Sequence, residues 1–142
     1  MNYDSRYKKE DSRGKIREFT DLKAWREEHR FAVAVYTETK KFPREEIFGL
    51  TSQLRRASIS VSSNIAEGFG RQGYKEKIQF YYLAQGSLTE CKSQLLLARD
   101  VGYLESIGFE TLFDQASTAH QLLQGLLKKS KELSVKRTIH ES

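Results

Sequence analysis

The chain has 142 residues, of which 38% are hydrophobic and 30% charged, a length and composition that predict one soluble globular domain with a single core. Its net charge of +5 permits nucleic-acid binding but fits a solvated basic surface equally well. No apolar run approaches the roughly 20 residues of a membrane span, and the first residues lack the apolar region of a signal peptide. The single cysteine, Cys91, excludes an intramolecular disulfide, so we expect a cytoplasmic protein.

Residues 1–18 are charged and show no periodicity, which is typical of a flexible arm. Apolar residues then recur at three- and four-residue steps and predict a first helix that ends before Phe42-Pro43. The expected inner face of this helix consists of Leu22, Trp25, His29, Ala32, Val33 and Tyr36.

The same spacing predicts three further helices. The second begins near 44–46 and stops at Gly68, the third runs from Tyr74 to Val101 with Gly102 as its C-terminal cap, and the fourth precedes a polar tail, residues 134–142. The expected inner face of the second helix is Ile47, Leu50, Leu54, Ala57, Val61 and Ile65. That of the third is Phe80, Leu83, Ala84, Ser87, Cys91, Ala98 and Val101, and that of the fourth is Phe109, Leu112, Phe113, Ala116, Ala119, Leu123 and Leu127. No segment alternates with a period of two, so the prediction is an all-α antiparallel four-helix bundle over residues 19–133.

Residues 68–73, GFGRQG, match the G-x-G-x-x-G pattern of dinucleotide-binding loops. That loop requires a strand before the glycines and a helix directly after them, so that the pyrophosphate meets a helix N-terminus. Here a helix is predicted before the glycines. We therefore interpret the match as a corner between two helices, with a nucleotide site as the third-ranked alternative.

The residue types of catalysis do not form a recognisable site. The serines near residue 60 lack a positioned base, the three histidines lie far apart in sequence, and the metal-binding patterns H-E-x-x-H, C-x-x-C and Glu-x-x-His are absent from the sequence. We expect no enzymatic activity, no cofactor and no metal.

Polar side chains form a line beside the apolar stripe of the second helix and face polar positions on the third. A buried network between the two helices is predicted, in which Arg56 pairs with Glu90 or Glu67 and fixes the helix register. Its members are Gln53, Arg56, Ser60, Asn64, Glu67, Ser87 and Glu90. A ligand or catalytic pocket is the alternative.

Basic residues provide the candidate nucleic-acid contacts. Arg55, Arg71, Lys75 and Lys77, together with the basic residues of both tails, are expected to contact phosphates without regard to base sequence. A solvated surface with interleaved acids, as in residues 75–77, is the alternative.

A second set of apolar and small residues lies away from the predicted inner faces and indicates a surface for a partner. Its members are Phe31 and Val35 on the first helix, and Phe48, Ser52, Ile59, Ser63 and Ala66 on the second. Symmetric assembly would repeat each basic patch around an axis.

Several stretches resemble a known family: DLKAW (21–25), FPREEIFGLTSQLRRASISVSSNIAEGFGR (42–71), AQGSLTECKSQL (84–95) and the turn at 102–104. They are similar to the bacterial four-helix-bundle family of 23S rRNA intervening-sequence proteins, from about Phe19 to Leu127. The resemblance implies an antiparallel bundle that assembles into a ring-like homopentamer, with no established molecular activity. Many members carry proline where this chain has Ser62, a serine able to bond back to a carbonyl of the preceding turn.

A more distant resemblance is to the accessory protein of diversity-generating retroelements, which binds nucleic acid and a reverse transcriptase. We therefore expect a non-enzymatic homopentamer that binds RNA or DNA and serves a reverse transcriptase or another nucleic-acid enzyme. The alternative is a protein-interaction scaffold whose charge only aids solubility.

Overall fold

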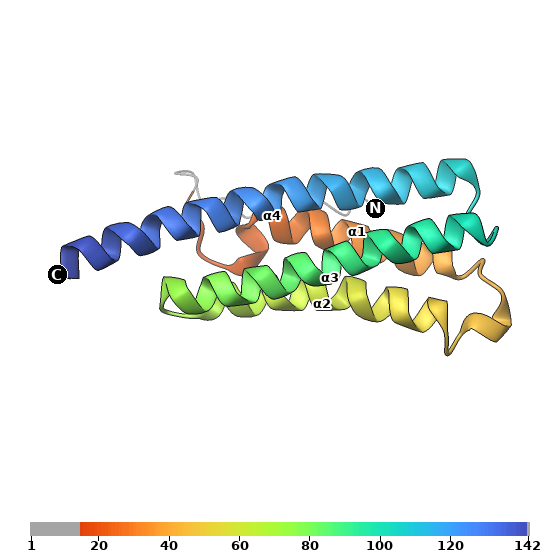
Figure 1. Cartoon of the computed structure of the whole chain (residues 1–142), viewed down its shortest axis with the longest axis horizontal. Coiled ribbons are helices and arrows are strands. Elements are labelled where there is room, and N and C mark those ends of the chain that lie inside the picture. Colours follow the sequence, from red (N-terminus) through yellow and green to blue (C-terminus); the bar gives the residue numbers. More distant parts are fainter. Residues whose placement is uncertain (1–14, 142) are drawn as a thin grey trace.

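The protein is an antiparallel bundle of four helices (Figure 1), described here from a computed structural model over residues 15–141, with side chains to Ile139. The helices are α1 (Lys23–Thr39), α2 (Leu50–Gly70), α3 (Tyr74–Asp100) and α4 (Ser106–Glu141), and the short 3-10 turns η2 (Phe19–Asp21) and η3 (Arg44–Glu46) precede α1 and α2. Each helix packs against its two neighbours in the cyclic order α1, α2, α3, α4. The predicted all-α four-helix fold is confirmed, while most of the predicted arm, residues 1–14, lies outside the described residues.

The inner face of α1 differs from the predicted one. Phe31 and Val35, predicted to face a partner, have no exposed surface and lie in the core. Val33 and Tyr36, predicted to be inside, are instead 43% and 39% exposed. Apolar residues occupy nearly every position from 31 to 36, so the helical spacing alone leaves two candidate faces; packing against both α2 and α4 selects the one centred on Phe31.

The start of α2 lies later than predicted. The η3 turn holds residues 44–46, and Glu46 then accepts a hydrogen bond from the backbone N–H of Leu50 at 2.9 Å, which satisfies a free donor of the first helical turn. Ile47 therefore lies in the connection and is 52% exposed rather than buried. The other predicted inner residues of α2 are buried.

Gly68 does not end α2, which continues to Gly70. A Cβ atom at Gly68 would lie 2.7 Å from Cε1 of Tyr81 and 2.9 Å from Cβ of Phe80, both on α3. The glycine therefore permits close approach of α2 and α3, whereas the sequence had suggested that it turns the chain. The predicted cap of α3 is confirmed, because Gly102 follows the helix with a φ of 87°.

The predicted face of α3 is partly wrong and that of α4 is right. Leu83 and Val101 are more than half exposed, and Tyr81, Leu88 and Leu95 occupy the core in their place. α4 remains helical beyond Ser134, where a polar tail was predicted, and its last turns project past the corner between α2 and α3 (Figure 1). Within the described residues, no helix is both long and apolar enough to cross a bilayer.

Candidate nucleic-acid interface

The four basic residues predicted to contact phosphates do not form one patch. Arg55 lies near the start of α2, where its Nε donates to Thr39 Oγ1 at 2.9 Å and its guanidinium lies 4.6 Å from the ring centre of Tyr36. Arg71 follows the other end of α2, 16 residues later, which is about 24 Å along a helix. Arg55 is thus engaged with the end of α1 and remote from the other three.

Lys77 is committed to the end of α2. Its ammonium donates to the carbonyl of Phe69 at 2.6 Å and to that of Gly68 at 3.4 Å, and lies 5.3 Å from the Phe69 ring centre. Partial burial lowers the pKa of Lys77. Because the last carbonyls of a helix have no partner within the helix, this lysine acts as a C-terminal cap.

Arg71 and Lys75 are exposed at the corner between α2 and α3. The Arg71 guanidinium lies 4.7 Å from the ring centre of Phe80, a contact that orients it without occupying its hydrogen-bond donors. These two residues therefore remain available to an external anion.

The C-terminal part of α4 lies beside this corner before its last turns project past it. Lys131 is 4.8 Å from the ring centre of Tyr82 on α3, and Lys129 lines a groove together with Lys23 and Arg26 at the start of α1. Three segments with many basic residues therefore meet at one end of the bundle. We call residues 15–27, 66–82 and 124–139 together the basic end.

The excess positive charge is concentrated at the basic end. It contains twelve Lys and Arg against six Asp and Glu, whereas residues 28–65 and 83–123 contain eight against nine. The bundle is therefore electrostatically polar along its length. Of the predicted tail contacts, Arg6, Lys8, Lys9 and Arg13 lie outside the described residues.

The predicted polar network is reduced to three small side chains. Ser60 and Ser87 join α2 to α3 through hydroxyl oxygens 2.9 Å apart, and Asn64 donates to the Ser60 carbonyl at 2.8 Å. The long side chains Gln53, Arg56, Glu67 and Glu90 are exposed. In residues 15–139 no ion pair joins Arg56 to either predicted partner, and all three side chains are exposed outside the contact that Ser60 and Ser87 make between α2 and α3.

A buried carboxyl group, Glu28 of α1, was missed by the sequence analysis. The side chain has no exposed surface, and neither oxygen has a hydrogen-bond partner among the described residues. Burial raises the pKa of Glu28 well above its usual value, so the neutral acid is favoured in the fold. The available signal was its position, three residues after Trp25 and three before Phe31, which is the centre of the true inner face.

Cys91 on α3 is fully buried close to Glu28. Burial, and after it the charges of Glu28 and Glu90, raise the pKa of the Cys91 thiol. A buried, protonated thiol is a poor nucleophile. Across residues 15–141, no three potential metal-binding side chains come together.

Known proteins support the fold. A family model described as 23S rRNA-intervening sequence protein matches residues 20–125. The chain is also similar to a Bacteroides thetaiotaomicron protein of unknown function from the S23 ribosomal protein family, with a TM-score of 0.69 and 22% identity over 74% of this chain and 95% of that one. No curated protein matches the chain significantly.

Proposed function

The chain belongs to the 23S rRNA-intervening sequence protein family, and we propose that it is a non-enzymatic, homo-oligomeric protein of the cytoplasm that binds RNA or DNA through its basic end. The observation that carries this proposal is the concentration of the excess positive charge at one end of the bundle. An accessory role beside a reverse transcriptase or another nucleic-acid enzyme would fit such a protein.

The structure changes which residues the proposal assigns to phosphate contacts. Arg71 and Lys75 remain candidates because they are exposed, whereas Arg55 and Lys77 already bond to the protein. Of the predicted tail contacts, five exposed basic residues on the C-terminal part of α4 also remain candidates: Lys128, Lys129, Lys131, Lys136 and Arg137. Contacts made through flexible cationic side chains favour binding that depends on salt rather than on base sequence.

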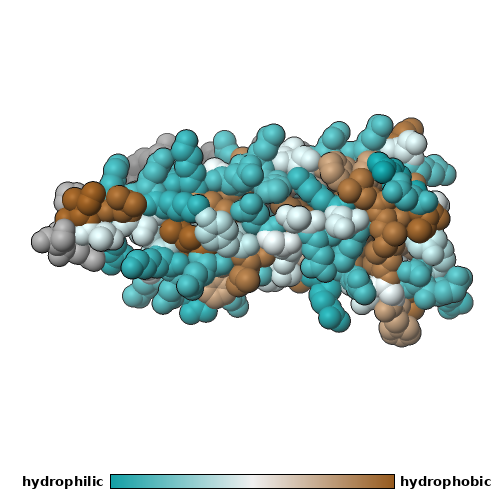
Figure 2. All heavy atoms as spheres, viewed as in Figure 1, coloured by the Kyte–Doolittle hydropathy of each residue, from teal (hydrophilic) through white to brown (hydrophobic). Residues whose placement is uncertain are grey.

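Exposed apolar residues at the opposite end support the proposed oligomer. Phe48 and Ile107 are 93% and 80% exposed, and Leu97 and Val101 are more than half exposed. Figure 2 shows apolar side chains gathered toward this end, where α3 leads into α4. A second copy would remove such a surface from water, and a pentameric ring would bring five basic ends into one array.

The test compares two variants that lose the same charge. Arg71→Gln/Lys75→Gln/Lys136→Gln removes three cations from the basic end, and Lys40→Gln/Arg44→Gln/Arg56→Gln removes three exposed ones elsewhere. Fluorescence anisotropy with a labelled single-stranded RNA measures the affinity of both variants at several salt concentrations. We expect the first variant alone to bind less tightly and to flatten log K against log [salt] by about 2 units of slope.

Equal losses in both variants would show that overall charge, and no particular surface, drives binding. Absence of wild-type binding at low salt would overturn the proposal and favour a protein-interaction scaffold. The apolar surface around Phe48 is the observation that keeps this second function open.

A further inference from the structure

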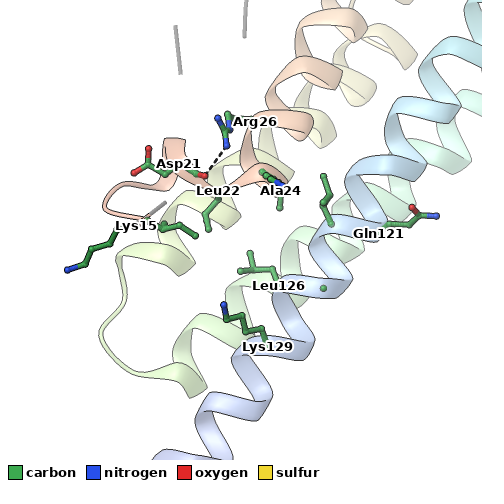
Figure 3. A pocket seen from close by; sticks show the side chains of 12 residues that line it. Lys15, Asp21, Leu22, Ala24, Arg26, Gln121, Leu126 and Lys129 are labelled. Atoms are coloured by element: carbon green, nitrogen blue, oxygen red, sulfur yellow. Dashed lines mark hydrogen bonds between the residues drawn. The ribbon is translucent and has the colours of Figure 1, made fainter. Parts of the chain in front are cut away.

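A groove separates the η2–α1 connection from the middle of α4 (Figure 3). Its volume is about 390 Å³, within the range of about 300–1,000 Å³ that is common for small-molecule sites. Leu22 and Ala24 line one side, and Leu122, Gly125 and Leu126 line the other. The groove thus has an apolar lining.

Gly125 keeps this lining open. Apart from its two chain neighbours and the backbone of its own helix, no atom lies within 4 Å of the position that a Cβ would occupy at Gly125, although the residue is in the interior of a 36-residue helix. Glycine at such a position is about 1 kcal/mol less favourable than alanine. The missing side chain leaves the backbone of α4 exposed along the floor of the groove.

The rim of the groove is positively charged. Lys15, Lys23 and Lys129 are exposed among its lining residues, and Figure 3 shows Lys129 extending from α4 beside Leu126 toward the η2–α1 side. The one acidic residue of the lining, Asp21, accepts hydrogen bonds from the backbone N–H groups of Arg17 and Glu18, both at 2.9 Å. Its charge is therefore already partly compensated.

The start of α1 adds to this positive field. Its N-cap residue is Leu22, whose apolar side chain makes no capping hydrogen bond. The positive end of a helix dipole favours a negative charge nearby. This end of α1 and the ammonium groups of Lys23 and Lys129 border the same groove.

We propose that this groove binds an amphiphilic anion, whose apolar tail lies along Leu122 and Leu126 over Gly125 and whose carboxylate or phosphate head lies between Lys23 and Lys129. The proposal goes beyond nucleic-acid binding, because a polyanion needs no apolar cavity. The site combines apolar burial of the tail with charge pairing at the rim, so it selects both parts of the ligand.

Isothermal titration calorimetry of the full chain with decanoate, below its micelle concentration, tests the proposal. We expect saturable binding of decanoate, with 1-decanol and decyltrimethylammonium bound at least about tenfold more weakly because they lack the negative head. Titration of decyl phosphate beside decanoate distinguishes the two head groups. Equal binding of decanol would overturn the charged part of the proposal.

Two variants localise the site. Gly125→Leu fills the groove with a better helix former and should weaken decanoate binding at least about tenfold. Gly86→Leu, at an equally open and exposed glycine on α3, should not weaken it. Lys23→Gln/Lys129→Gln should weaken decanoate but not decanol, relative to the charge-matched Lys40→Gln/Lys128→Gln. Unchanged decanoate affinity in both groove variants would place any binding elsewhere and overturn the assignment. All of these variants retain Arg71, Lys75 and Lys136, the three residues that the nucleic-acid test replaces.

Discussion

At the scale of single residues, Glu28 makes the stability of the bundle depend on pH. Its pKa is raised in the fold, so the native state holds the proton more tightly than the unfolded chain does. The resulting stabilisation is complete below the unfolded pKa, about 4.3, and is lost as the pH rises toward the folded pKa. Alkaline conditions therefore oppose this part of the core.

Glu28→Met should remove that dependence while keeping a side chain of similar length. Replacing buried ionic groups by well-packed apolar side chains often raises the free energy of unfolding by about 1–4 kcal/mol. We expect such a gain at pH 8, a smaller one at pH 5, and no effect for Glu110→Gln on the surface of α4. Urea unfolding at both pH values measures this, and equal gains at both would contradict the assigned burial effect.

A second residue-scale prediction concerns Gly68. Gly68→Ala improves helix propensity but places a methyl group against Tyr81 and Phe80, so we expect a loss of about 1–3 kcal/mol in the free energy of unfolding. Gly86→Ala has open space and should instead be neutral or gain about 0.5–1 kcal/mol. The urea midpoint should fall for Gly68→Ala and should stay the same or rise for Gly86→Ala. An unchanged or raised midpoint for Gly68→Ala would mean that α2 and α3 are not in close contact at Gly68.

At the scale of elements, helix number and most boundaries followed from apolar spacing, and the inner faces followed only where that spacing was unambiguous. The stripe of α4 was predictable because polar residues separate its apolar positions, whereas the run around Phe31 on α1 allowed two faces. That choice also concealed Glu28. The back-bonding serine was predictable, and Ser62 donates to the Ile59 carbonyl at 3.0 Å.

The candidate site was predicted less well, because sequence shows charge but not whether a cation already has a partner. Arg55 and Lys77 resembled Lys75 in the sequence, yet only Lys75 has no contact that holds it to the protein in residues 15–139. The cause lies in tertiary placement. A lysine near a helix end can donate to the last carbonyls of that helix, and the sequence does not show which lysine lies there.

Lys77 provides the test of this distinction. Lys77→Ala removes the cap from α2 and should cost about 1 kcal/mol of stability while leaving nucleic-acid affinity close to wild type. Lys75→Ala should do the reverse. Thermal unfolding measures the stability of both variants, and anisotropy measures their nucleic-acid affinity. A binding defect confined to Lys77→Ala would show that Lys77, and not Lys75, contacts the nucleic acid.

At the scale of the whole molecule, the apolar surface and the basic end are spatially separate. Phe48→Asp/Ile107→Asp should therefore dissociate the proposed oligomer, while Val135→Asp, also an exposed apolar position but on the projecting part of α4, should not. Light scattering after size exclusion reports the mass of each. A wild-type monomer would contradict the oligomer and leave the basic end of a single chain to bind alone.

The separation of charge along the bundle also bears on how two molecules meet. A body with its positive excess at one end has a large electric dipole, so the field of a polyanion turns it before contact. The projecting turns of α4 would then contact the polyanion first, and few collisions would occur in orientations that cannot bind. The rate of association would be high at low ionic strength. It would fall to the rate of an undirected search as the Debye length shrinks.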